Sequence, residues 1–178
     1  MILCSLLDKD IEPDIILIQE SWIGGDLLPQ YLQLDNYSAV AQGYKISTHG
    51  GLVTYLKTHL NATKIDICSN TTVFEGLVLK VENMEDKSMP SVIVSNIYKP
   101  PHDNNNRANI EKFIEEITPL VKFCNETNSE ILIGGDFNIN LLKMNENSSY
   151  SEFIDMMFNN SLYPKITMPT RFSTYFTS

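Results

Sequence analysis

The sequence predicts an α/β domain in which two packed, mixed β-sheets carry helices on their outer faces. Short apolar runs such as residues 131–133 alternate along the chain with a smaller number of helical patterns. Several of these runs end directly in acidic, amide or aromatic residues, which is where strands of α/β proteins deliver side chains to a site. No repeat and no linker divides the chain, so we expect residues 1–178 to form one domain.

The first half of the chain is expected to consist mostly of strands. Residues 2–11 have the apolar spacing of the end of a helix, which must finish before Pro13. Residues 14–19 form a continuous apolar strand, and the glycines and proline of residues 22–36 allow only a short helical turn near residues 28–34. Apolar alternation predicts four further strands, at residues 37–42, 50–57, 64–69 and 73–81.

The second half is expected to contain the main helices. After a strand at residues 91–98, apolar residues recur at helical spacing over residues 107–125. Pro119 lies inside this pattern and lacks an amide hydrogen, so we expect a kink or a break near Thr118. The remaining elements are a strand and a second helix, at residues 130–134 and about 149–160.

Composition and charge exclude several classes of protein. The chain has 178 residues, of which 43% are hydrophobic, and this is enough for a globular core. Its net charge of −9 argues against a surface that holds nucleic acid by charge alone, although a divalent cation neutralises the carboxylates of a metal site. The three cysteines follow no metal-ligand spacing, the N-terminal residues lack the pattern of a signal peptide, and no apolar run reaches membrane-spanning length. We therefore expect an intracellular protein, nuclear or cytoplasmic, that is neither secreted nor held in a membrane.

Polar residues directly follow the most apolar strand, which we expect to be buried on both faces. Gly134 and Gly135 are expected to end this strand, to turn the backbone and to leave room for a ligand. Asp136 and Asn138 come next, and in an extended tip their spacing would direct both side chains to the same side. Two interpretations stay open: a catalytic pair, or an Asx turn in which the side chains bind loop amides.

Two other strands have the same design, and together the three resemble a known family. Residues 15–20 read IILIQE, residues 95–101 read SNIYKPP, and residues 134–138 read GGDFN. In this order, over nearly the whole chain, these motifs resemble the endonuclease/exonuclease/phosphatase superfamily. IYKPP, GGDFNIN and the later MPTRFS are most similar to the endonuclease that precedes the reverse transcriptase in non-LTR (LINE-like) retrotransposons. The resemblance implies a four-layered α/β sandwich with its site at the end where the strand tips gather.

The resemblance also implies the chemistry of the site. Members of this branch nick DNA with a divalent cation, Mg²⁺ or Mn²⁺, and Glu20 stands at the position of the metal-binding glutamate. Asp136 would orient or deprotonate the attacking water, and Asn138 would donate to the scissile phosphate. Tyr98 would hydrogen-bond the phosphate or assist the leaving group.

Each of these candidates has a structural alternative. Glu20 could be a surface glutamate at a strand end, and Tyr98 could be an amphipathic rim residue packed on Pro100. A loop threonine and a solvated arginine are common outcomes for the MPTRF segment. Three residues are nevertheless expected to contact the substrate, namely Asn96, Thr170 and Arg171.

The family pattern includes two elements that this sequence does not contain. A first strand that ends in an asparagine metal ligand would precede residue 2, and an Asp-His segment would follow MPTRFS. We therefore expect a domain that is incomplete at both termini, from an element that would also carry a reverse transcriptase. Two functions stay open: a DNA-nicking endonuclease or another phosphoesterase of the superfamily, and a catalytically inactive remnant of such a domain.

Overall fold

The computed structural model describes residues 12–46, 49–101, 107–127, 129–140 and 148–166. The helix expected over residues 2–11 and the candidates Thr170 and Arg171 lie outside these ranges. The described elements are, in chain order, β1 (Ile15–Ile18), the 3₁₀ helix η1 (Gln30–Leu32), β2 (Tyr37–Gln42), β3 (Leu52–Lys57), β4 (Leu60–Ile65), β5 (Glu75–Asn83), β6 (Val92–Tyr98), α2 (Arg107–Glu126), β7 (Glu130–Asp136) and α3 (Ser148–Asn159).

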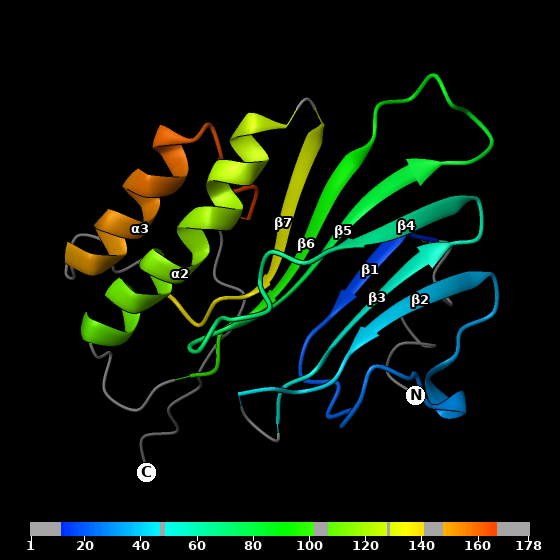
Figure 1. The fold of residues 1–178 in the computed structure, drawn as a ribbon, viewed down its shortest axis with the longest axis horizontal. Coiled ribbons are helices and arrows are strands. Elements are labelled where there is room, and N and C mark those ends of the chain that lie inside the picture. Colours follow the sequence, from blue (N-terminus) through cyan, green and yellow to red (C-terminus); the bar gives the residue numbers. More distant parts are fainter. Residues whose placement is uncertain (1–11, 47–48, 102–106, 128, 141–147, 167–178) are drawn as a thin grey trace, which may run out of the picture.

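Within the described residues the strands form two sheets that pack face to face (Figure 1). The three-stranded sheet has the order β1-β3-β2 and is antiparallel. The four-stranded sheet has the order β4-β5-β6-β7 and is mixed, because β6 and β7 run parallel. Helices α2 and α3 cover the outer face of the four-stranded sheet (Figure 1). The predicted α/β class, with two packed sheets and external helices, is confirmed, although only one of the two sheets is mixed.

The core between the sheets is apolar over most of its length. Leu77 and Leu79 of β5 and Val94 of β6 point toward the three-stranded sheet, where they meet Leu52 and Leu56 of β3. All five side chains are fully buried. Burial of each such side chain stabilises the fold by about 1.5–3 kcal/mol, so this core holds the two sheets together.

The opposite face of the four-stranded sheet packs under the helices. Phe113 of α2 is fully buried, and its ring centroid lies between 5.2 and 6.2 Å from those of three other aromatic residues, Phe74, Phe137 and Phe153. The free thiols of Cys68 and Cys124 lie in the same cluster. Burial raises the pKa of Cys68 to about 12 and that of Cys124 to about 11, so both thiols stay protonated and unreactive near neutral pH.

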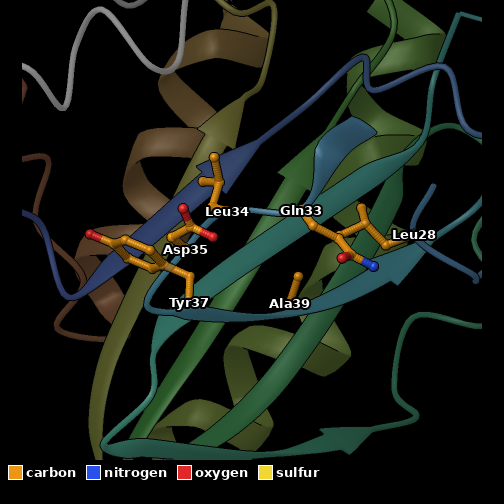
Figure 2. Close-up of a pocket in the computed structure, with 6 residues that line it drawn as sticks. All are labelled: Leu28, Gln33, Leu34, Asp35, Tyr37 and Ala39. Atoms are coloured by element: carbon orange, nitrogen blue, oxygen red, sulfur yellow. The ribbon is translucent and has the colours of Figure 1, made fainter. Parts of the chain in front are cut away.

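The outer face of the three-stranded sheet is covered by the segment between β1 and β2. Ile23 and Tyr55 are buried there, and the Tyr55 hydroxyl donates to the Leu32 carbonyl, which ties η1 to β3. Tyr37 of β2 donates from its hydroxyl to the Pro13 carbonyl at 2.7 Å. A hollow of about 320 Å³ remains at this face (Figure 2), lined by Leu28, Gln33, Leu34, Asp35, Tyr37 and Ala39. None of the described residues predicted for the site lines this hollow.

Helix α2 continues through Pro119, so of the kink or break expected near Thr118 the break is absent. Glu115, whose carbonyl loses its amide donor to the proline, lies with Pro119 on the exposed face of the helix, where water can bind that carbonyl. The Thr118 hydroxyl donates to the Ile114 carbonyl one position earlier. Neither α2 nor any other helix among the described residues has the length and apolar character needed to cross a membrane.

Strand β4 begins at Leu60, four residues earlier than expected, and ends at Ile65. Its register with β5 pairs Leu60 with Asn83 and Ile65 with Val78. β4 is an edge strand, and it contributes only two residues, Leu60 and Ala62, to the inter-sheet core. Its run of alternating apolar residues is therefore short. The residues predicted as the rest of this strand form a turn before β5.

Strand β7 extends through both glycines, so the expectation that they end the strand is wrong. A Cβ on Gly135 would collide with the Ile97 carbonyl of β6, and a Cβ on Gly134 would lie 2.8 Å from the Leu17 side chain of β1. The glycines therefore allow β6 and β1 to approach β7 closely. The expectation of burial on both faces is also wrong, because β7 is an edge of the described sheet and Leu132 is 45% exposed.

Candidate active site

A row of three polar side chains crosses one end of the four-stranded sheet. Glu75 at the start of β5 pairs with Tyr98 at the end of β6, and Tyr98 pairs with Asp136 at the end of β7. Paired residues direct their side chains to the same face of a sheet, and the buried Tyr98 belongs to the inter-sheet core. The row therefore faces the three-stranded sheet, with a phenol between two carboxylates.

Glu20 reaches this row from the opposite sheet. It follows the end of β1 and has a φ of 52°, in the left-handed region that few residues other than glycine adopt. The Tyr98 hydroxyl donates to Glu20 Oε1 at 2.7 Å, although the two residues lie 78 positions apart in the sequence. Glu20 is otherwise exposed. The structure thus brings together two of the predicted site residues at the gathered strand tips.

The environment of Tyr98 keeps its hydroxyl protonated. The pKa of Tyr98 is raised well above its usual value, first by burial and then by its hydrogen bond to Glu20 and the nearby negative charges, among them Asp136 and Glu75. Tyr98 therefore acts as a neutral hydrogen-bond donor over the physiological pH range and not as a base. Glu20, Asp136 and Glu75 thus all act electrostatically on the same phenol.

The loop after β7 folds back on the end of β6. The Asn138 backbone amide donates to Asp136 Oδ1 at 3.1 Å, so the Asx turn considered from the sequence is present. Asn138 has a φ of 48° and is not extended, and its side-chain Nδ2 donates to the Lys99 carbonyl at 2.9 Å. These bonds use one oxygen of Asp136 and one amide hydrogen of Asn138. Both residues are exposed, so a substrate can reach their side chains.

Asn96 of β6 lies inside the molecule, behind the site, with an exposed fraction of 0%. Its Nδ2 donates to the carbonyls of Ile18 and Val53, both at 3.1 Å, and its Oδ1 accepts from Gln19 Nε2 at 2.6 Å. These bonds connect the four-stranded sheet to the end of β1 and to β3. Asn96 thereby holds the chain immediately before Glu20, while its expected contact with substrate stays a prediction.

Glu75 is a site residue that the sequence reasoning missed. Its side chain is buried, and Oε1 accepts from the backbone amides of Lys45 and Ile46 at 2.9 and 3.1 Å, while Oε2 accepts from Gly51 at 2.7 Å. A Cβ on Gly50 would collide with this carboxylate. Glu75 therefore fixes the loop between β2 and β3 through its backbone.

This loop in turn holds the segment that follows Glu20. Two backbone amides of that segment donate to loop carbonyls, Ser21 N to Gly51 O at 3.1 Å and Trp22 N to Gly50 O at 2.9 Å. Glu75 thus acts on the position of Glu20 through the backbone. Strand alternation could have revealed it, because Glu75 shares the core-facing parity of Leu77, and a glutamate on a core face requires partners.

Lys99 is a second residue that the sequence reasoning did not single out. It follows Tyr98, is 3% exposed, and its backbone amide donates to the Asp136 carbonyl at 2.9 Å. Burial lowers the pKa of Lys99, and the negative charge of Asp136 acts in the opposite direction. Lys99 therefore places a basic nitrogen within electrostatic reach of Asp136.

The donor atoms of the site suit a hard divalent cation. Glu20 and Asp136 offer exposed carboxylate oxygens beside a neutral phenol, and Mg²⁺ is usually bound through one or two carboxylates while it keeps several waters. Among the described residues, no group of three or more His, Cys, Asp and Glu side chains gathers as a metal-binding cluster. This arrangement differs from a zinc centre, in which protein side chains supply most ligands, and Glu20 is the residue that would hold a cation here.

Two solved structures have a similar fold. The crystal structure of the Xenopus laevis APE2 catalytic domain superposes with a TM-score of 0.61 at 18% identity, over 87% of this chain and 62% of that one. The AP endonuclease LMAP from Leishmania major gives a TM-score of 0.51 at 14% identity, over 88% of this chain and 60% of that one. The chain therefore spans about three fifths of these proteins, and at such identities the likeness concerns the fold. None of the curated proteins compared with the chain matches it.

The family comparison covers almost the entire sequence. The model described as the Endonuclease/Exonuclease/phosphatase family matches residues 3–177. The matched range contains all three strand-end motifs and the residues that meet at the site, Glu20, Tyr98 and Asp136. The chain therefore belongs to the endonuclease/exonuclease/phosphatase family.

Proposed function

We propose that this chain hydrolyses phosphodiester bonds in DNA as an endonuclease that depends on a divalent cation. The observation that carries the proposal is the meeting of Glu20 with the row of Tyr98 and Asp136 at one end of the two sheets. Phosphodiester hydrolysis requires neutralisation of the phosphoryl charge, activation of water and stabilisation of the leaving oxygen. Two accessible carboxylates and a protonated phenol are suitable for these tasks, and family membership supports the same class of reaction.

Each residue has a proposed role in the reaction. The exposed carboxylate of Asp136 orients the attacking water and accepts its proton. Asn138, with one amide hydrogen bound to the Lys99 carbonyl, donates the other to a phosphate oxygen. Tyr98 donates to Glu20 in the free protein, and it is suited to donate to the phosphate or the leaving oxygen because its hydroxyl stays protonated.

Nucleases of this family generally use divalent metal ions, and we propose Mg²⁺ or Mn²⁺ here. Such a cation, when bound through Glu20, would neutralise charge on the phosphoryl group. Glu20 is suited to hold it because its carboxylate is exposed and one of its oxygens is already oriented by Tyr98. We also propose that three further residues contact the substrate or shape its site, namely Asn96, Thr170 and Arg171.

The finer proposal concerns the biological origin of the chain. The motifs IYKPP, GGDFNIN and MPTRFS support an endonuclease of a non-LTR retrotransposon, which nicks DNA and leaves a 3′-hydroxyl for a reverse transcriptase. The full element would carry that reverse transcriptase and act inside the cell, in the nucleus or the cytoplasm. The alternative is that the chain is a catalytically inactive relative of such an enzyme. The following experiment distinguishes an active enzyme from an inactive one.

The test is nicking of supercoiled plasmid by the purified chain, with Mg²⁺ or Mn²⁺ and with a chelator. We expect nicked circles whose ends a DNA polymerase can extend, because the proposed reaction leaves a 3′-hydroxyl. Asp136→Asn should abolish nicking, since the amide cannot accept the proton of the attacking water. Asp155→Asn, which changes an exposed aspartate on α3, is the matched control and should nick normally.

The result that overturns the proposal is the absence of nicking by a chain whose circular dichroism and cooperative unfolding demonstrate that it is folded. Nicking that survives in Asp136→Asn would instead reject the assigned role of Asp136 and point to a contaminating nuclease. A phosphatase or deadenylase activity without nicking would retain the family chemistry and reject DNA as the substrate.

A further inference from the structure

A large aromatic side chain stands exposed next to the candidate site. Trp22, the only tryptophan of the chain, is 62% exposed and follows Glu20 by two residues. Its neighbour Ile23 is buried against the outer face of the three-stranded sheet. Two residues of chain span at most about 7 Å, so the Trp22 backbone lies close to Glu20, the residue proposed to bind the cation.

The exposed position of Trp22 is imposed by the backbone on both sides. Its amide donates to the Gly50 carbonyl at 2.9 Å, and the following residue, Ile23, accepts from the Tyr44 amide at 3.0 Å. Trp22 has a φ of 56°, a conformation that bulky residues rarely adopt. The fold therefore holds an indole outward in an unfavourable backbone conformation, which is a pattern typical of functional sites.

The indole contacts a second ring and is otherwise largely exposed. Trp22 and His49 pack edge to face, with ring centroids 5.3 Å apart and an interplanar angle of 83°. An edge-to-face contact covers at most one of the two faces of an indole. An aromatic face of this size is a surface on which a nucleobase stacks, whatever its sequence.

Because the chain is acidic, a stacking contact would contribute much of its affinity for DNA. A protein with a net charge of −9 gains little from general attraction to phosphates, so most of its affinity for DNA must come from other contacts. We propose that Trp22, supported by His49, stacks on an unpaired or unstacked nucleobase adjacent to the phosphate that is cut. This inference rests on the proposed function, because it assumes that the substrate is a DNA strand.

Intrinsic fluorescence tests the contact directly, because Trp22 is the only indole in the protein. The intact chain is titrated in chelator, so that no cleavage occurs, with a short single-stranded DNA and with an abasic strand of the same length and phosphate count. We expect saturable quenching by the DNA and little change with the abasic strand. Equal quenching by both strands, or no response to either, overturns the stacking proposal.

Variants give a second and independent measurement. Base stacking on an aromatic residue contributes about 1–3 kcal/mol, so Trp22→Ala should raise KM for nicking by about 5- to 150-fold with little change in kcat. Trp22→Phe should recover much of the loss, because phenyl rings also stack on bases. Tyr31→Ala is the matched control, since Tyr31 is an 82% exposed aromatic residue on η1, outside the site.

These outcomes separate the stacking proposal from the proposed catalytic function. Nicking with an unchanged KM in Trp22→Ala rejects the stacking contact and leaves the endonuclease. Base-dependent quenching by a folded chain that does not nick supports the contact and rejects catalysis. A fall in kcat without a change in KM assigns Trp22 to holding Glu20 and rejects its contact with the base.

Discussion

The two faces of strands β5 and β6 differ in the side chains that they bury. On the helix face, Phe113 packs against other aromatic rings in a cluster of apolar side chains. On the inter-sheet face, the apolar pair Leu79 and Val94 gives way to Asn96 and Tyr98 toward the site, although all of these residues are buried. The first face mainly stabilises the fold, whereas the second also positions polar groups of the other sheet.

This difference follows from what each face must hold. Apolar contacts tolerate exchange of shape and volume, because dispersion and burial have no direction. A buried amide or carboxylate is acceptable only with its hydrogen bonds in place, so it fixes the groups that it binds. Both residues have such bonds: Asn96 binds β1 and β3, and Glu75 binds the loop before β3. Mutations on the two faces should therefore differ in kind as well as in size.

The largest effect is expected from Phe113→Ala on the helix face. Loss of this fully buried ring should lower the free energy of unfolding by about 3–5 kcal/mol, because it leaves a cavity among its aromatic neighbours. Urea unfolding measures this loss, and the activity per folded molecule should not change. Phe158→Ala, at a 43% exposed position of α3, should cost far less. A selective loss of activity in folded Phe113→Ala would remove the distinction between the faces.

Asn96→Ala on the inter-sheet face should cost less stability but also reduce activity. It leaves the Gln19 amide and the carbonyls of Ile18 and Val53 without their buried partner, which should lower the free energy of unfolding by about 1–3 kcal/mol. Because Ile18 and Gln19 directly precede Glu20, nicking and Mn²⁺ binding should weaken together. Asn125→Ala on the exposed side of α2 is the control. Full activity with the same loss of stability would make Asn96 a packing residue only.

Glu75→Gln should act mainly on the rate. The amide retains the shape of the side chain but replaces an acceptor with a donor, which then opposes the backbone amide of Gly51 or those of Lys45 and Ile46. A displaced loop should shift Glu20 and lower kcat by about 10- to 100-fold, with KM for DNA less affected. Steady-state nicking measures both constants, with Glu115→Gln as the control. If Glu75→Gln changed thermal stability alone, its link to Glu20 would be rejected.

The smallest effect is a pH dependence of stability from Tyr98. Because the pKa of Tyr98 is raised in the folded protein, the unfolded phenol loses its proton first, near pH 10. The contribution of Tyr98 to stability is therefore complete below about pH 10 and falls as the pH rises further toward the folded pKa. In urea unfolding between about pH 9 and pH 11, Tyr98→Phe should show a shallower decline than the unmodified chain. Parallel declines would contradict the neutral, buried state of this phenol.

Much of the framework and of the site was predictable from local patterns. Strand β2 has the bounds that alternation predicts, and α2 differs from its predicted range by one residue. Glu20 and Tyr98 were candidates because each directly follows or ends an apolar strand, and they meet in a 2.7 Å hydrogen bond. Such features depend on residues close in sequence, whose periodicity reports which face is buried.

The effects of neighbours that are distant in sequence were decided only by the tertiary structure. Gly134 and Gly135 resemble a strand end, yet they are strand residues that must be small because β1 and β6 approach them. Pro119 resembles a helix breaker, yet the exposed side of α2 tolerates it. Each outcome depends on which surface lies opposite the residue, and a local pattern does not contain that information.

The sequence by itself therefore determined the α/β class, the strand tips that carry polar groups, and the family to which their motifs belong. The tertiary structure decided which of those groups meet and what holds them. Glu75 is the clearest case. It is a single glutamate in an apolar strand, and its role is explained only by the backbone amides that it binds, which lie 24 to 30 residues away in the sequence. The physical reason is that a buried charge is determined by its partners, and the fold alone brings those partners to it.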